Sequence, residues 1–146
     1  MHVGASGICA VVGCLGFMVG GCSTSAAGDG GAIELSWVLR NQRGTLIDCA
    51  AANVTNITLH WKVADEAASA TWDCDDRHGL TRFVVPPGDV SLFVTAGCAD
   101  APADPSTYYA PATLVRTVTE GQVVALGAVV FVLQNESCEL QACTCQ

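Results

Sequence analysis

The chain has few charged residues, and basic ones are the scarcest. It contains six lysine and arginine residues against 14 aspartates and glutamates, which gives a formal net charge of −8 at pH 7. Nucleic acids and anionic membrane surfaces are bound through clusters of basic side chains. The basic residues here are spread from Arg40 to Arg116 and form no cluster. The composition therefore argues against nucleic acid or anionic lipid as a partner.

A hydrophobic run long enough to cross a membrane is also missing. No aspartate, glutamate, lysine or arginine precedes Asp29, and residues 8–19 are apolar or glycine throughout. A membrane-spanning helix needs about 20 apolar residues, whereas the hydrophobic region of a secretory signal has about 7–15. Residues 1–21 are therefore predicted to be a cleaved signal peptide.

This predicted signal ends at a cysteine. Gly20 and Gly21 lead into Cys22, and small polar residues follow it. The arrangement resembles a bacterial lipoprotein signal, which implies that Cys22 carries the fatty acyl chains and becomes the new N-terminus. Ser23 in the next position resembles an outer-membrane sorting signal, so we expect a lipid-anchored outer-membrane protein that faces the periplasm or the cell surface. The alternative is an ordinary secretory signal cut near Ala26, with Cys22 discarded.

The rest of the chain divides into three parts. Residues 22–31 are small, polar and rich in glycine, as in a flexible linker. Residues 32–134 carry strand patterns and suit one domain that can bury a core. Residues 135–146 form a cysteine-rich tail that is too short and too polar for a core of its own.

Apolar residues in the domain recur with a period of two, which predicts half-buried β-strands. The expected strands are 33–40, 57–63, 71–74, 80–85, 90–96, 113–119 and 123–133, and the last is apolar on both faces and therefore central. Short strands separated by turn signals, in a domain of this size, indicate an all-β fold, an antiparallel seven-stranded β-sandwich. The expected core residues are Trp37, Leu39, Leu59, Trp61, Leu92, Val94, Val129 and Phe131.

Several short segments follow one another in a distinctive order. They are Ser36-Trp37-Val38-Leu39, Cys49-Ala50-Ala51-Ala52, Asn56-Ile57-Thr58-Leu59, Asp73-Cys74, Val85-Pro86-Pro87-Gly88-Asp89-Val90-Ser91-Leu92 and Gly121-Gln122-Val123. This order is similar to small bacterial outer-membrane lipoproteins with a prealbumin-like or CnaB-like β-sandwich; an immunoglobulin-like sandwich is the alternative. Val90 departs from the family, which more often has an aromatic residue there. The resemblance implies the fold and an envelope location, without an assigned activity.

The number of cysteines fits an exported protein. The chain has nine. Cys9 and Cys14 leave with the leader and Cys22 is acylated, so nine less three leaves six, an even number suited to disulfides. These six are Cys49, Cys74, Cys98, Cys138, Cys143 and Cys145.

The resemblance implies a disulfide between Cys49 and Cys74. Cys98 would then pair with a tail cysteine, Cys138 or Cys143, and so join the tail to the sandwich. A bridge between Cys143 and Cys145 remains open, although its one-residue loop would be strained.

The remaining polar clusters do not match a known site. Asp73–Asp76 lacks the oxygen spacing of a calcium loop, and the tail cysteines lack the paired spacing of a zinc site. No Gly-x-Ser-x-Gly segment is present, and His60 falls on the solvent side of its strand. We therefore expect no metal site, no cofactor and no enzymatic activity.

Two functional hypotheses follow. The first is a lipid-anchored, non-catalytic structural or interaction module of the cell envelope, which would present the loops at 73–76 and 99–106 to a protein or another envelope component. The alternative is a carbohydrate or small-ligand binding module on the cell surface. Its stacking platforms would be Trp72, Tyr108 and Tyr109.

Overall fold

The structure is a computed structural model that describes residues 29–99, 102–103, 108–109 and 112–134. Its elements are β1 (Ala32–Arg40), β2 (Leu46–Ile47), β3 (Asn56–Val63), β4 (Glu66–Asp73), the 3-10 helix η1 (Cys74–Asp76), β5 (His78–Leu80), β6 (Gly88–Gly97), β7 (Tyr108–Tyr109), β8 (Leu114–Val118) and β9 (Val123–Leu133). The described part of the chain is all-β, as predicted. No helix within it has the length and apolarity needed to cross a membrane. The signal peptide, most of the linker and the tail lie outside the described residues.

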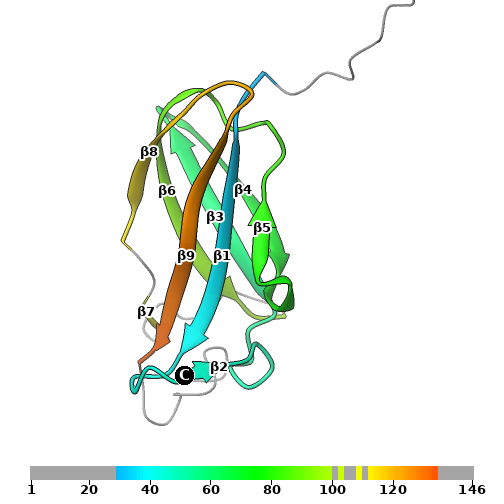
Figure 1. Cartoon of the computed structure of the whole chain (residues 1–146), viewed down its shortest axis with the longest axis vertical. Coiled ribbons are helices and arrows are strands. Elements are labelled where there is room, and N and C mark those ends of the chain that lie inside the picture. The colour runs from blue at the N-terminus through cyan, green and yellow to red at the C-terminus, as the bar shows by residue number, and fades with distance from the viewer. Residues whose placement is uncertain (1–28, 100–101, 104–107, 110–111, 135–146) are drawn as a thin grey trace, which may run out of the picture.

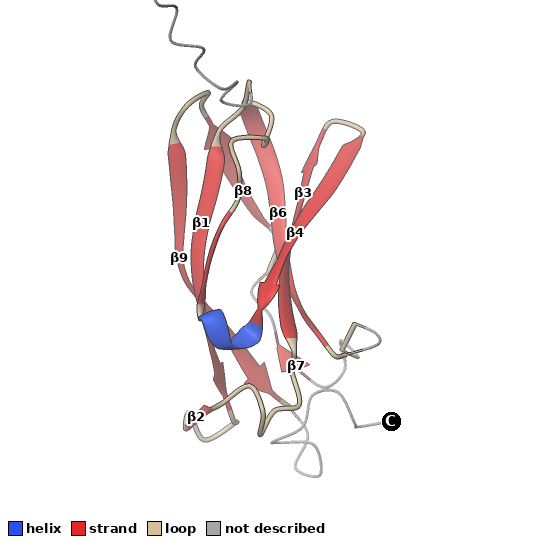
Figure 2. Cartoon of the chain, turned by 90° about the vertical axis from the view of Figure 1, so that its right-hand side faces the viewer, coloured by secondary structure: helices blue, strands red, loops and turns tan. Residues whose placement is uncertain are grey.

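The strands form two layers (Figure 1). The first, which we call the β1 sheet, has the order β2-β1-β9-β7, with β5 also paired to β1. The second, the β3 sheet, has the order β4-β3-β6-β8. Figure 2 shows η1 at the point where the chain passes between the two layers. The predicted β-sandwich is confirmed.

One strand pair departs from the predicted antiparallel arrangement. β1 and β9 run parallel, with Trp37 opposite Val129 and Leu39 opposite Phe131, whereas every other described strand pair is antiparallel. Parallel strands need a long connection, and here the whole of the β3 sheet lies between β1 and β9 in the sequence. The chain therefore enters the sandwich at one end and leaves it at the other (Figure 1).

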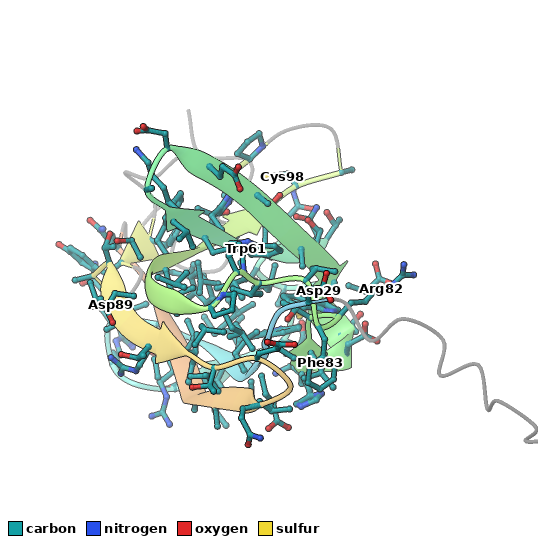
Figure 3. All side chains as sticks on the ribbon, turned by 90° about the horizontal axis from the view of Figure 1, so that it is seen from above. Asp29, Trp61, Arg82, Phe83, Asp89 and Cys98 are labelled. Atoms are coloured by element: carbon teal, nitrogen blue, oxygen red, sulfur yellow. A yellow bond between two sulfur atoms is a disulfide. The ribbon has the colours of Figure 1, made fainter. Side chains whose placement is uncertain are left out.

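The core lies between the two sheets and follows the period-two pattern. All eight predicted core residues are buried. Each large apolar side chain that is removed from water stabilises the fold by about 1.5–3 kcal/mol. Seen from above, Trp61 lies near the middle of the sandwich, whereas Asp89 and Arg82 lie at its rim (Figure 3). The alternation within β1 and β3 was therefore sufficient to identify which face each strand buries.

β9 was expected to be central, and this is correct only for its C-terminal end. β7 pairs with it at Leu133 and Val132 alone, so the earlier part of β9 has β1 as its single strand partner among the described residues. A bulge explains why β9 looked apolar on both faces. The register with β1 shifts near Gly127, whose φ of 76° suits glycine. Before this point the even-numbered residues of β9 face the core, and after it the odd-numbered residues do.

Two predicted strand boundaries were wrong. The strand expected at 71–74 begins earlier, and β4 covers Glu66–Asp73. The strand expected at 80–85 ends at Leu80, because the side chain of Thr81, and not its backbone carbonyl, accepts the next hydrogen bond from β1. The hydroxyl of Thr81 accepts the hydrogen bond from the Ile33 backbone N–H at 2.9 Å, in the place of a backbone carbonyl. Thr81 is also the only buried polar residue in the described part of the chain.

Candidate functional site

The structure places the predicted disulfide between Cys49 and Cys74. Their sulfur atoms are 2.02 Å apart and their Cα atoms 5.9 Å apart. Both residues are buried and belong to the core. The bridge fixes the segment before β3 to η1 at one end of the sandwich.

Cys98 is also disulfide-bonded, and its partner is outside the described residues. Cys98 follows directly after β6 and is half-buried. Its predicted pairing with Cys138 or Cys143 stays a prediction. The same is true of the acylation of Cys22 and of the state of Cys145, because all of these residues lie outside the described part of the chain.

The acidic segment 73–76 does not gather its carboxylates around a common point. Cys74–Asp76 form η1, and the side chains of Asp73, Asp75 and Asp76 are exposed. The described residues contain no group of three or more His, Cys, Asp or Glu side chains arranged to hold a metal ion. The nearby His78 instead makes a single hydrogen-bonding contact, in which its Nε2 lies 2.8 Å from Oε1 of Glu34.

The predicted aromatic platform is wrong, because its members are separated and partly buried. Trp72 packs toward the core, with its ring centroid 6.2 Å from that of Trp37. Tyr108 is buried against Phe131. Only Tyr109 is largely exposed, and it lies on the other sheet from Trp72. Strand aromatics whose side chains reach the inner face are used for packing here.

A groove of about 520 Å³ lies on the outer face of the β3 sheet. Its lining residues come mainly from β4, β3 and β6, three neighbouring strands whose backbone is seen in Figure 2. We call it the β3 groove. Its floor is formed by outward-facing residues of these strands, and Cys98 and Pro102 close one end. The floor residues are Thr58, His60, Thr71, Phe93 and Thr95.

Strand register brings these residues together from distant parts of the sequence. Thr58 of β3 lies opposite Thr71 of β4 and Thr95 of β6. His60 lies opposite Phe93 of β6. Because alternate residues of a strand face the same side, all five project from one face, away from the core.

The floor contains a stacked ring pair. The rings of His60 and Phe93 have centroids 4.4 Å apart and planes inclined by only 7°. Phe93 keeps 43% of its surface exposed, so part of the ring is accessible from the groove. His60 was predicted to point to solvent, and the structure confirms that placement.

Hydroxyl groups surround the ring pair. The Thr58 and Thr71 hydroxyl oxygens are 2.9 Å apart and share a hydrogen bond. Nε2 of His60 lies 2.9 Å from the Thr95 hydroxyl. Desolvation by its surroundings lowers the pKa of His60 below its ordinary value of 6.5, which favours the neutral ring at pH 7. The groove therefore offers an apolar ring and uncharged hydrogen-bonding groups.

Sequence reasoning did not identify this groove. The outward positions of Thr58 and His60 could be read from the alternation in β3, but their neighbours depend on how β3 aligns with β4 and β6. No local motif links His60 to Phe93, which is 33 positions later in the sequence. The signal that could have found the site is the recurrence of polar and aromatic residues at outward positions of three strands.

Comparison with known proteins gives little further information. No protein-family model matches the chain, and no curated protein matches its sequence. Among solved structures, the chain is similar to a pilus-presented adhesin, Cpa, at 13% sequence identity and a TM-score of 0.37 over 77% of this chain. The chain spans 29% of the length of that adhesin. A similarity of this size identifies neither a partner nor a function for the chain.

Proposed function

We propose that this chain is a lipid-anchored protein of the bacterial cell envelope, in which the β-sandwich is a non-catalytic interaction module. The observation that carries the proposal is the buried Cys49–Cys74 disulfide. Structural disulfides persist in oxidising compartments and are rare in the cytosol. A chain that folds around such a bridge is therefore best explained as an exported one, which agrees with the leader that precedes Cys22.

The position of the domain relative to the proposed anchor follows from the length of the linker. Residues 23–29, fully extended, span at most about 25 Å. Gly30 then packs directly against the backbone of Val85, where a Cβ would clash with the carbonyl oxygen. The end of the sandwich at which β1 starts would thus stay near the membrane. The end that carries the Cys49–Cys74 bridge would face away from it.

A non-catalytic role is supported by the arrangement of the two described histidines. His60 pairs with Thr95 on the β3 sheet, and His78 pairs with Glu34 on the β1 sheet. A catalytic triad needs a histidine that contacts a hydroxyl or thiol nucleophile through one ring nitrogen and a carboxylate through the other. His60 contacts only the hydroxyl and His78 only the carboxylate among the described residues, so neither completes that arrangement.

The anchor is tested by intact-mass analysis of the mature protein from membrane fractions. The expected result is a diacyl or triacyl mass on an N-terminal Cys22, and loss of both acylation and membrane association in Cys22→Ala. Cys14→Ala is the matched control, since it removes a leader cysteine that is discarded in processing, and it should leave the mature mass unchanged.

A soluble, unmodified mature protein that begins near Ala27 would overturn the proposed anchor. The outer-membrane location is tested separately by fractionating the envelope. Protease treatment of intact cells then distinguishes the two faces, because only a surface-facing domain is accessible to the protease.

A further inference from the structure

We propose that the β3 groove binds a neutral saccharide. This deepens the proposed interaction role by naming a ligand class and a site, and it does not depend on the lipid anchor. The argument uses the five floor residues Thr58, His60, Thr71, Phe93 and Thr95, together with the strand pairing beneath them. None of these residues is required by the core, which lies on the opposite face of the sheet.

The size of the groove suits one or two sugar rings. Small-molecule sites in proteins commonly have volumes of about 300–1,000 Å³, and the β3 groove has about 520 Å³. The groove is concave and lies on three strands that are fixed by continuous pairing. β3 pairs with β4 from Asn56 to Val63 and with β6 from Asn56 to Lys62. The floor is therefore rigid and preformed.

The same pairing argues against a peptide that adds as a strand. Strand addition needs a row of unpaired backbone N–H and C=O groups at a sheet edge. The floor of the β3 groove is formed around β3, whose two edges are both occupied. Above β3 only side chains are available to a ligand, so recognition there must come from the hydroxyls, the imidazole and the Phe93 ring. The outer edge of β4, which has no strand partner among the described residues, lies beside the groove and not under these groups.

The Phe93 ring supplies an apolar surface of the kind that packs against the C–H face of a sugar. It is 43% exposed, and its stacking on His60 at 4.4 Å holds the ring in one orientation. A ring that is already fixed loses little conformational entropy when a ligand covers it. The energetic contribution comes from the burial of apolar area on both the ring and the sugar.

The hydroxyls supply hydrogen bonds on either side of that ring. A threonine hydroxyl has one donor and two acceptor positions. The shared bond between Thr58 and Thr71 uses one donor and one acceptor, so the pair still has a donor and further acceptors for a ligand. Sugar hydroxyls likewise donate and accept, and they complement such a mixed surface.

The charge distribution favours a neutral ligand. No lysine, arginine, aspartate or glutamate lines the groove, although the chain carries a net charge of −8. Lys62 lies beyond His60 at one end of this face, and Asp73 lies beside Asn56 at the other. An anionic saccharide would need basic groups in the groove, and a cationic ligand would need carboxylates there.

The test uses the full-length processed protein in detergent on an array that carries neutral oligosaccharides and acidic ones (sialylated, sulfated and uronic-acid glycans). We expect binding to neutral glycans. Calorimetric titration with the best neutral glycan should then show affinity at least about tenfold weaker for Phe93→Ala, from loss of the stacking surface. Thr95→Val, which keeps the β-branched shape but removes the hydroxyl, should also weaken binding.

Tyr109→Ala is the matched control. It removes an aromatic side chain that is 61% exposed but belongs to β7 of the other sheet, and it should leave affinity unchanged. Thermal unfolding of each variant verifies that Phe93→Ala and Thr95→Val remain folded. If the array shows no neutral glycan bound, only acidic glycans bound, or equal binding by Phe93→Ala, the saccharide site is wrong. The acylation result for Cys22 would stand unchanged in each of those cases.

Discussion

The indole Nε1 of Trp37 donates a hydrogen bond of 2.8 Å to the backbone carbonyl of Cys74. Trp37 lies in the β1 sheet, whereas Cys74 follows β4 of the β3 sheet, so this bond joins the two layers. Cys74 also forms the disulfide with Cys49. Three segments that are distant in the sequence are therefore held together at this one end of the sandwich.

Replacing Trp37 by phenylalanine should destabilise the protein, because the buried carbonyl of Cys74 loses its indole donor. That carbonyl keeps its hydrogen bond from the Arg77 backbone N–H, so the expected cost beyond packing is that of one hydrogen bond, about 0.5–1.5 kcal/mol. Denaturant unfolding measures the loss. Trp61→Phe is the control, since Trp61 is also buried but donates no hydrogen bond to a described residue. Equal losses in the two variants would show that the hydrogen bond contributes nothing beyond packing.

Removing the bridge with the double substitution Cys49→Ala and Cys74→Ala should lower the unfolding free energy by about 3–4 kcal/mol. The two cysteines are separated by 25 positions, and closing a loop of that length restricts the unfolded chain by about this amount. The comparison is made by denaturant unfolding without reductant, so that the Cys98 disulfide stays intact. A variant as stable as the parent would contradict a structural role for this bridge.

Gly79→Ala should be destabilising because Trp72 occupies the space above Gly79. A Cβ at this position would lie 2.6 Å from the Trp72 ring, which is closer than real contacts allow. Overpacking of this kind costs about 1–3 kcal/mol. A double-mutant cycle with Trp72→Leu isolates the clash, since the alanine should cost clearly less when the indole is absent. If Gly79→Ala lowers the unfolding free energy equally with and without the Trp72 indole, a clash with Trp72 is not the cause.

His60 should titrate at a pH below 6.5 in the folded protein, because desolvation lowers its pKa. The unfolded chain then binds more protons than the folded one just below pH 6.5, so stability falls as the pH decreases through that range. NMR titration of the imidazole protons measures the pKa directly. His60→Gln should reduce the dependence of the unfolding free energy on pH in this window. An imidazole that titrates above 6.5 would reverse the sign of the effect.

Local sequence patterns were sufficient for the strands whose two faces differ strongly. In β1 and β3, large apolar residues alternate with polar ones, and both strands and their buried faces were predicted correctly. β4 was shortened in the prediction because residues 67–70 are Ala-Ala-Ser-Ala, and such small side chains give little contrast between faces. β9 was misread for a different reason. The bulge at Gly127 inserts one extra residue, so the residues that face the core do not follow a single two-residue period along the strand.

Features that depend on alignment between strands could not be predicted in the same way. The parallel pairing of β1 with β9 follows from the overall path of the chain, and nothing within either strand specifies it. The β3 groove likewise depends on the register that places Thr58 between Thr71 and Thr95. A local sequence pattern shows which residues of one strand face outward. A binding surface on a sheet also depends on which residues of the neighbouring strands lie beside them, and no local pattern shows that.

The parallel β1–β9 pair determines how the domain would respond to mechanical load. If the start of β1 is held by a membrane anchor and a partner pulls beyond the end of β9, the two strands are pulled lengthwise in opposite directions. Their ladder, from Ala32 opposite Val123 to Arg40 opposite Val132, would then be loaded in shear. Hydrogen bonds loaded in shear must break together instead of one after another, so this geometry resists extension.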